Sequence, residues 1–193
     1  MAKYRLLVSA IVLALLQVGF LGWTIVSRAT ILRAGPEVLL KVEPVDPRDL
    51  LRGDYVRLGY EISNVPVKLI VNRDADTTAS AEGAIHVRLK KGEDGFWHPV
   101  SAALGAGFAD VPVEGEVEVL GTVTSGWLQD EQSTVRVDYG IGRYYLPEGE
   151  GTAIERDMRV RRFGILAAVG KDGALQIKAL MDGDKALFSE PLY

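Results

Sequence analysis

Apolar positions follow two different patterns along the chain. Residues 6–26 form one unbroken apolar run without a charged side chain. A helix rises about 1.5 Å per residue, so such a run is long enough to cross a hydrocarbon core of about 30 Å. From residue 37 onward, apolar residues come in short alternating runs, which are typical of half-buried β-strands. The pattern predicts a single transmembrane helix followed by a β-rich domain.

The apolar run is better explained as an uncleaved anchor than as a signal peptide. A signal peptide has a shorter apolar core and a small-residue cleavage site, and the sequence after Val26, SRATI, offers no such site. Two basic residues, Lys3 and Arg5, precede the run, and Arg28 and Arg33 follow it, so the charge bias toward a cytoplasmic N-terminus is weak. We expect a single-pass protein of the cell membrane whose C-terminal domain faces the periplasm or the outside. The predicted parts are a cytoplasmic N-terminus (1–5), an anchor in the lipid bilayer (6–26), a juxtamembrane linker (27–36) and an extracytoplasmic domain (37–193).

The alternating runs predict a mainly antiparallel β domain with one or two short helices, and a two-lobed arrangement is an alternative to a single lobe. Glycine-containing turns connect two pairs of runs as hairpins, at residues 91–95 and 171–173. One helix is predicted at 153–162, where Thr152 and Glu155 form a capping box. Strands are predicted at 37–43, 54–63, 67–71, 84–90, 96–104, 111–124, 135–141, 143–146, 163–169 and 174–181, with a turn at 64–66 and a polar loop at 72–83.

Constrained residues are densest between positions 44 and 63, PVDPRDLLRGDYVRLGYEIS. Asp46 and Pro47 suit the start of a helical turn, and Gly53 suits its end because glycine tolerates positive φ. The strand that follows places Leu58 and Tyr60 on one face, together with Asp54, Val56 and Ile62. Tyr55 lies on the opposite face, so we expect one of the two tyrosines in the core and the other free to serve as a contact surface.

Residues 53–60, GDYVRLGY, resemble the bacterial family that is named after its GDYXXLXY motif. The preceding PVDPRDLLR and the later YGIGRYYLPEGEGTAIE, residues 139–155, are also similar to that family. The resemblance implies a membrane-anchored domain of unknown function, an accessory to an integral membrane protein, and it brings no catalytic residues. It marks Asp46, Pro47, Arg48, Asp49, Arg52, Gly53, Asp54, Tyr55, Leu58 and Tyr60 as structural or partner-contacting, with Glu148, Gly149, Thr152 and Glu155 as a second motif.

Composition excludes several classes of function. The chain has no cysteine, so a disulfide framework and a cysteine metal site are excluded. It carries 22 basic and 26 acidic residues; without the four basic residues that flank the anchor, 18 face 26, a net charge of −8. Nucleic acid is therefore not expected as a partner, since it needs a basic surface. The negative net charge suits a soluble domain held near a membrane.

Other candidate sites each have a plainer structural explanation. Asp54 could orient a base or hold a metal, but it more simply caps backbone N–H groups. The acids Glu148, Glu150 and Glu155 could bind calcium, although no EF-hand spacing is present. His86 and His98 lie on adjacent predicted strands and could approach each other, but no third zinc ligand is evident. We therefore expect neither a metal nor a cofactor.

Two further interpretations concern segments near the motifs. One is a cluster of arginines that could bind a partner, and the other is an enzymatic activity. Arg156, Arg159, Arg161 and Arg162 could contact lipid headgroups or an acidic partner, or could form a solvated helix face. Residues 52–56, RGDYV, resemble one box of signal peptidase I, but the Ser-Met pair of that family is absent from the chain. We therefore favour a non-catalytic accessory or binding module for an integral membrane protein. The alternatives are a signal-peptidase-like hydrolase that lacks its Ser/Lys dyad, and a binder of a small ligand or cation.

Overall fold

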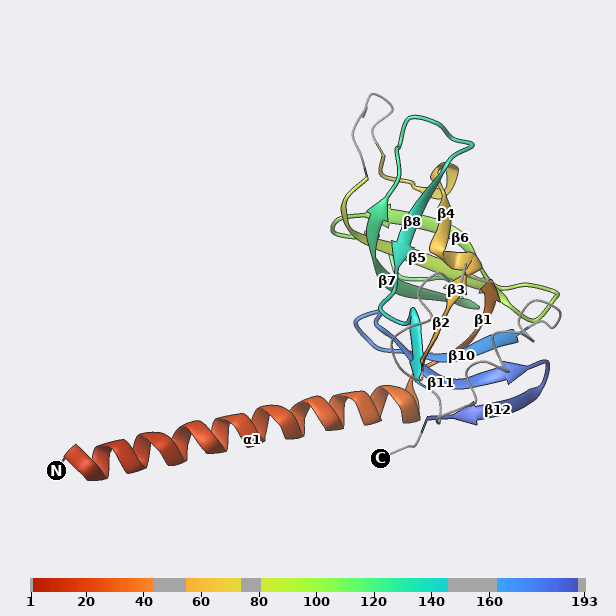
Figure 1. Ribbon diagram of the computed structural model, residues 1–193. Coiled ribbons are helices and arrows are strands. Elements are labelled where there is room, and N and C mark those ends of the chain that lie inside the picture. The colour runs from red at the N-terminus through yellow and green to blue at the C-terminus, as the bar shows by residue number, and fades with distance from the viewer. Residues whose placement is uncertain (1, 44–54, 74–80, 146–162, 191–193) are drawn as a thin grey trace.

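The computed structural model describes residues 2–43, 55–73, 81–145 and 163–190. These form one long N-terminal helix and two five-stranded sheets, with a small two-stranded sheet beside them (Figure 1). Every strand pairing within the sheets is antiparallel. The predicted fold class is thus confirmed for the described residues.

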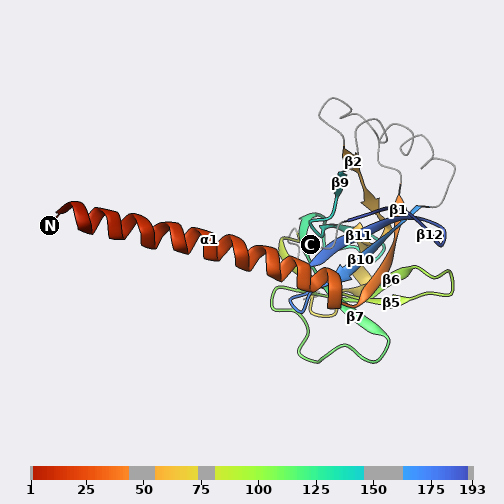
Figure 2. The same cartoon turned by 90° about the horizontal axis from the view of Figure 1, so that it is seen from below.

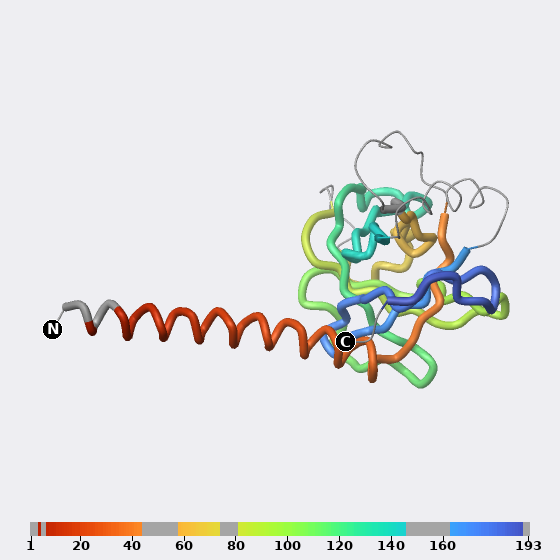
Figure 3. Tube along the Cα trace, turned by 60° about the horizontal axis from the view of Figure 1, so that its bottom comes forward, coloured from red at the N-terminus to blue at the C-terminus, as the bar shows by residue number. Residues whose placement is uncertain are grey.

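Helix α1, Ala2–Ala34, contains the predicted apolar run. Its segment Leu7–Ala34 is long and apolar enough to span a membrane, and none of its most apolar window is buried against the rest of the chain. Except at its C-terminal end, the helix projects away from the β domain with no other described segment beside it (Figures 1 and 3). The predicted juxtamembrane linker at 27–36 is helical as far as Ala34. After the apolar run, the first residues that disfavour a helix are Gly35 and Pro36. Before them, the hydroxyls of Ser27 and Thr30 bond to carbonyls of the preceding turn.

The end of α1 is fixed to the domain. Leu32 is only 8% exposed, and the backbone N–H of Val169 donates a hydrogen bond of 2.9 Å to the carbonyl of Pro36. A Cβ atom at Gly35 would lie 2.6 Å from the carbonyl oxygen of Val169, so only glycine allows this close approach. The helix therefore meets the domain with a defined geometry.

The first large sheet joins both ends of the domain sequence. Its strand order is β12-β11-β10-β1-β3, and β1 lies between β10 and β3. The predicted strand at 37–43 and the hairpin of β10 and β11 are confirmed, whereas β12 was not predicted. The bounds are β1 Glu37–Glu43, β3 Gly59–Tyr60, β10 Phe163–Val169, β11 Leu175–Asp182 and β12 Lys185–Ser189.

The second large sheet comes from the middle of the chain, in the order β4-β8-β7-β5-β6. The predicted hairpin of β5 and β6 is confirmed. The bounds are β4 Asn64–Pro66, β5 Gly83–Lys91, β6 Trp97–Leu104, β7 Glu116–Ser125 and β8 Thr134–Asp138. A separate pair is formed by β2, Tyr55–Arg57, and β9, Arg143–Tyr145 (Figure 2).

The prediction of one continuous strand at 54–63 is wrong. The chain forms β2, leaves the strand at Leu58, forms β3 and then makes one 3-10 turn, η1, at Glu61–Ser63. These pieces pair with different partners, β9 and β1, so a continuous ladder is impossible.

The predicted turn at 64–66 is also wrong. Residues 64–66 form strand β4, which pairs with β8, and Val67–Leu69 is a second 3-10 turn, η2. Pro66 has no N–H to donate and is tolerated because β4 is an edge strand. Partners far along the chain therefore override the local turn signal.

Two strand boundaries also differ from prediction. The strand predicted at 111–124 begins only at Glu116, after a turn in which its N–H bonds to the carbonyl of Val113 and Gly115 has a φ of 83°. The strand predicted at 135–141 ends at Asp138, because Gly140 has a φ of 75° and its N–H bonds to the Asp138 carboxylate.

Side chains of both large sheets pack into one apolar core. Its largest fully buried members are Leu40, Ile62, Ile85, Leu89, Ile165 and Leu180, which come from both sheets and from η1. The possible division into two lobes therefore does not extend to the core of the described residues. The first sheet combines segments from both ends of the domain, so sequence halves and sheets do not coincide.

Candidate functional site

The two motif segments meet in space. Strand β2 pairs with β9, so that Tyr55 lies opposite Tyr145 and Arg57 opposite Arg143. The contact continues where the N–H of Leu58 donates a hydrogen bond of 3.0 Å to the carbonyl of Gly142. We call the segments 55–62 and 139–145 together the motif junction. Because these segments lie about 80 residues apart, only the tertiary fold brings them together.

Two buried tyrosines bond across the motif junction in opposite directions. The Tyr60 hydroxyl donates to the carbonyl of Ile141 at 2.7 Å, and the Tyr139 hydroxyl donates to the carbonyl of Ile62 at 2.9 Å. Tyr60 is 3% exposed and Tyr139 is 6% exposed. Burial raises the pKa of both hydroxyls, so both remain protonated donors at neutral pH. The pair satisfies two backbone carbonyls that the strand ladders leave free.

The motif residues whose side chains are described belong mostly to the core. Leu58, Tyr60 and Ile62 are all buried, which confirms that they share a face even though the strand is interrupted. Tyr60 is the expected core tyrosine. For Tyr55 the structure describes the backbone pairing alone, so its expected role as a contact surface stays a prediction.

A pocket of about 490 Å³ opens beside the motif junction. The segment 58–60 lines it from the first motif, and Tyr139, Ile141 and Gly142 line it from the second. Three charged residues, Glu43, Arg136 and Asp138, also line it, so carboxylates outnumber the single guanidinium. The other lining residues are Ser63, Asn64, Thr124 and Val137.

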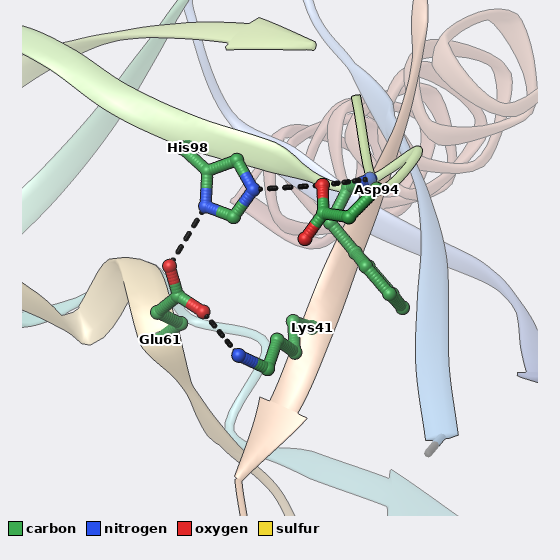
Figure 4. A network of polar contacts seen from close by, with 5 residues as sticks. Lys41, Glu61, Asp94 and His98 are labelled. Atoms are coloured by element: carbon green, nitrogen blue, oxygen red, sulfur yellow. Dashed lines mark hydrogen bonds and ion pairs between the residues drawn. The ribbon is translucent and has the colours of Figure 1, made fainter. Parts of the chain in front are cut away.

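A network of charged side chains includes Glu61 of η1 and connects the two large sheets (Figure 4). Lys41 on β1 donates to Glu61 on η1 at 2.8 Å. The other Glu61 oxygen lies 2.7 Å from Nδ1 of His98 on β6, and Nε2 of His98 lies 3.0 Å from Asp94 in the β5–β6 turn. We call these four residues the His98 network. Its residues are partly exposed.

Electrostatics in the His98 network favour the charged form of every member. The bonds to Asp94 and Glu61 raise the pKa of His98, so both ring nitrogens carry protons over a wider pH range. Lys41 and His98 lower the pKa of Glu61, and the bond to His98 lowers that of Asp94. The bond to Glu61 raises the pKa of Lys41. Two cations face two anions, an arrangement that holds elements together and leaves no free base.

The two histidines do not share a site. His86 lies opposite Ala103 in the β5–β6 ladder, whereas His98 lies opposite Lys90, so about four residues or 13 Å of strand separate them. The suggestion that they approach is wrong. His98 lies on β6, an edge strand, and His86 bonds instead to Glu118 at 2.8 Å. No group of three or more potential metal ligands is found among the described residues.

Another cluster holds the loop between β6 and β7 against the sheet. Arg88 is buried and contacts both the carboxylate and the carbonyl of Asp110, and its guanidinium lies 3.9 Å from the centre of the Phe108 ring. The same guanidinium lies 3.6 Å from Glu118, the partner of His86. The cluster places one guanidinium against two carboxylates, and Val111 in the same loop is exposed.

Many residues singled out in the sequence lie outside the described residues, so their predicted roles stay predictions. The set comprises the helical turn at 46–53, the second-motif residues and the arginine patch with its helix at 153–162. The residues are Asp46, Pro47, Arg48, Asp49, Arg52, Gly53, Asp54, Glu148, Gly149, Thr152, Glu155, Arg156, Arg159, Arg161 and Arg162.

Sequence reasoning did not identify Lys41, Glu61, Asp94 or Tyr139 as site residues. A half-buried strand with a central lysine gives a weak signal for Lys41, and the second motif contains Tyr139. Nothing local connects Glu61 to His98, because their separation in sequence is closed only by sheet packing.

Comparison with known proteins agrees with the motif. The family model described as GDYXXLXY protein matches residues 17–180. No curated protein and no solved structure matches the chain.

Proposed function

The chain belongs to the GDYXXLXY family, whose function is unknown, and from that premise we propose that it is a membrane-anchored, extracytoplasmic accessory module. In this proposal α1 spans the cell membrane and the β domain binds an integral membrane protein without catalysing a reaction.

The observation that carries the proposal is the geometry of α1. The helix exposes its apolar side chains around its whole circumference, which in water is unfavourable and in hydrocarbon is favourable. Its C-terminal end is fixed to the domain through Leu32 and Gly35 instead of through a flexible linker. A domain attached in this way stays at the membrane surface in one orientation, as a module that contacts a membrane-embedded neighbour requires.

The polar side chains of the described domain support binding over catalysis. Within the described ranges of the β domain both histidines bond to carboxylates, and the Ser133 hydroxyl bonds to backbone carbonyls. The peptidase alternative requires an activated serine. An activity-based serine probe tests it directly, because specific labelling of the full-length chain would contradict a non-catalytic role.

Topology fusions test the anchor. We expect alkaline phosphatase fused after Tyr193 to be active and a fluorescent protein that matures only in the cytoplasm to be dark. We also expect the full-length chain to stay in the pellet after carbonate extraction. A fluorescent fusion, or release by carbonate, would overturn the proposal.

The pocket supports a second candidate, a site for a small cationic ligand. Glu43 and Asp138 both line it, and carboxylates attract cations. We expect calcium or an alkylammonium salt to raise the melting temperature of the wild type and not of a Glu43→Gln, Asp138→Asn variant. Equal shifts in both proteins would show that binding occurs elsewhere.

A further inference from the structure

One polar residue lies in the middle of the apolar run of α1. Gln17 occupies this position, and its side chain is exposed. The hydroxyls of Thr24, Ser27 and Thr30 bond to carbonyls of their own helix at 2.8–2.9 Å. The side-chain amide of Gln17 makes no hydrogen bond within the described part of the chain. In hydrocarbon, an amide without a partner is costly, so a neighbouring helix that bonds to it is favoured.

The side of α1 around Gln17 combines small and large side chains. At 3.6 residues per turn, six residues between positions 10 and 24 project within about 60° of Gln17. Two of them are alanines, whose small side chains let another backbone approach closely. The six are Ala10, Leu13, Ala14, Phe20, Leu21 and Thr24, and we call them with Gln17 the Gln17 face. Leu15 projects from the opposite side.

The Gln17 face points to the side on which the domain lies. Ile31 and Leu32 project about 40° and 60° to either side of Gln17. These residues contact the domain: Leu32 is buried, and a Cβ atom at Gly170 would lie 3.1 Å from Cδ1 of Ile31. The domain lies to one side of the helix axis at this end (Figure 1). A helix packed on the Gln17 face would therefore run toward the domain.

The same geometry disfavours a second copy of this chain as the occupant. In a parallel pair joined through the Gln17 faces, each domain would extend over the other helix, so the two domains would compete for one volume. Arg28 projects within about 20° of Gln17 and would face its own copy across the pair. A different helix carries neither penalty, and an acidic residue near its end would complement Arg28.

We propose that the Gln17 face binds a transmembrane helix of a different protein, one with a hydrogen-bonding side chain at the bilayer midplane. The β domain then lies over the extracytoplasmic end of that helix. This inference rests on the proposed function, since it identifies the part of the chain that contacts the membrane partner.

Photocrosslinking of the full-length chain in its native membranes tests the proposal. Benzoylphenylalanine replaces Leu21 in one variant and Leu15 in the control, which projects from the opposite side about 9 Å further from the domain. We expect the Leu21 variant to form a product with another protein, and the Leu15 variant to form little of it. Adding Gln17→Leu should reduce the Leu21 product about three- to tenfold, and Gln17→Asn should retain most of it.

Three results would overturn the proposal: equal products from both positions, no effect of Gln17→Leu, or a product between two differently tagged copies of this chain. Gln17→Leu makes the span more apolar, so the variant stays in the membrane, as carbonate extraction verifies. Failure of the proposed function is distinct, because it appears in the topology fusions or in carbonate release before any crosslink is formed.

Discussion

The motif junction and the His98 network both contact the same short 3-10 turn, η1, but through different interactions. The Ile62 carbonyl of η1 accepts a hydrogen bond from Tyr139, whereas the Glu61 side chain of η1 bonds to Lys41 and His98. The first contact is buried and neutral, and the second is partly exposed and charged. Water competes for the second and not for the first, so we expect the junction to contribute more stability and the network to contribute pH dependence.

The largest expected effect is the loss of a tyrosine hydroxyl in the motif junction. Tyr60→Phe leaves the buried carbonyl of Ile141 without this donor, and Tyr139→Phe does the same for Ile62. We expect each to lower the free energy of unfolding by about 1–3 kcal/mol. Urea unfolding of the full-length chain in detergent, followed by circular dichroism, measures the loss. Unchanged midpoints would show that other donors satisfy these carbonyls.

A smaller, pH-dependent effect is expected for His98→Asn. The pKa of His98 is raised above its ordinary value of 6.5, so its stabilising contribution is complete below 6.5 and is lost as pH rises through the raised value. The pKa of Glu61 is lowered from 4.5, so its contribution is complete above 4.5 and is lost as pH falls through the lowered value. The difference between wild type and variant should therefore be largest between pH 4.5 and 6.5.

Because His98 is partly exposed, we expect that difference to be at most about 1 kcal/mol. Tyr139→Phe is the matched control, since its tyrosine does not titrate in this range and its loss should be the same at each pH. Urea midpoints at half-unit intervals from pH 4 to 8.5 would test the comparison. A constant difference for His98→Asn would contradict a charged network.

The smallest effect is expected for Lys41→Met. The pair with Glu61 is 2.8 Å long, but the two side chains are 43% and 32% exposed. We expect a loss of about 0.5 kcal/mol, falling toward zero in 1 M salt because exposed ion pairs are screened. Unfolding midpoints at low and high salt measure it. A loss above that of Tyr60→Phe would reverse the ranking of the two regions.

Patterns that are local in sequence predicted local structure well. The helix α1 and the hairpins β5–β6 and β10–β11 were predicted because their signals, an uninterrupted apolar run and alternation around a glycine turn, act between neighbouring residues. Burial of Leu58 and Tyr60 was also predictable from alternation. The two motif segments were identified by resemblance, and the structure shows that they pair with each other.

The sequence by itself determined that an apolar helix precedes an antiparallel β domain, because side-chain period and turn chemistry are properties of adjacent residues. Only the tertiary structure decided that β1 lies between β10 and β3, that residues 64–66 form a strand, and that Tyr60 meets Ile141 while His98 meets Glu61. These contacts join residues that are dozens of positions apart. Their formation depends on the burial of one core shared by both sheets, and no local pattern encodes which distant backbone group will lie within hydrogen-bonding distance once that core has formed.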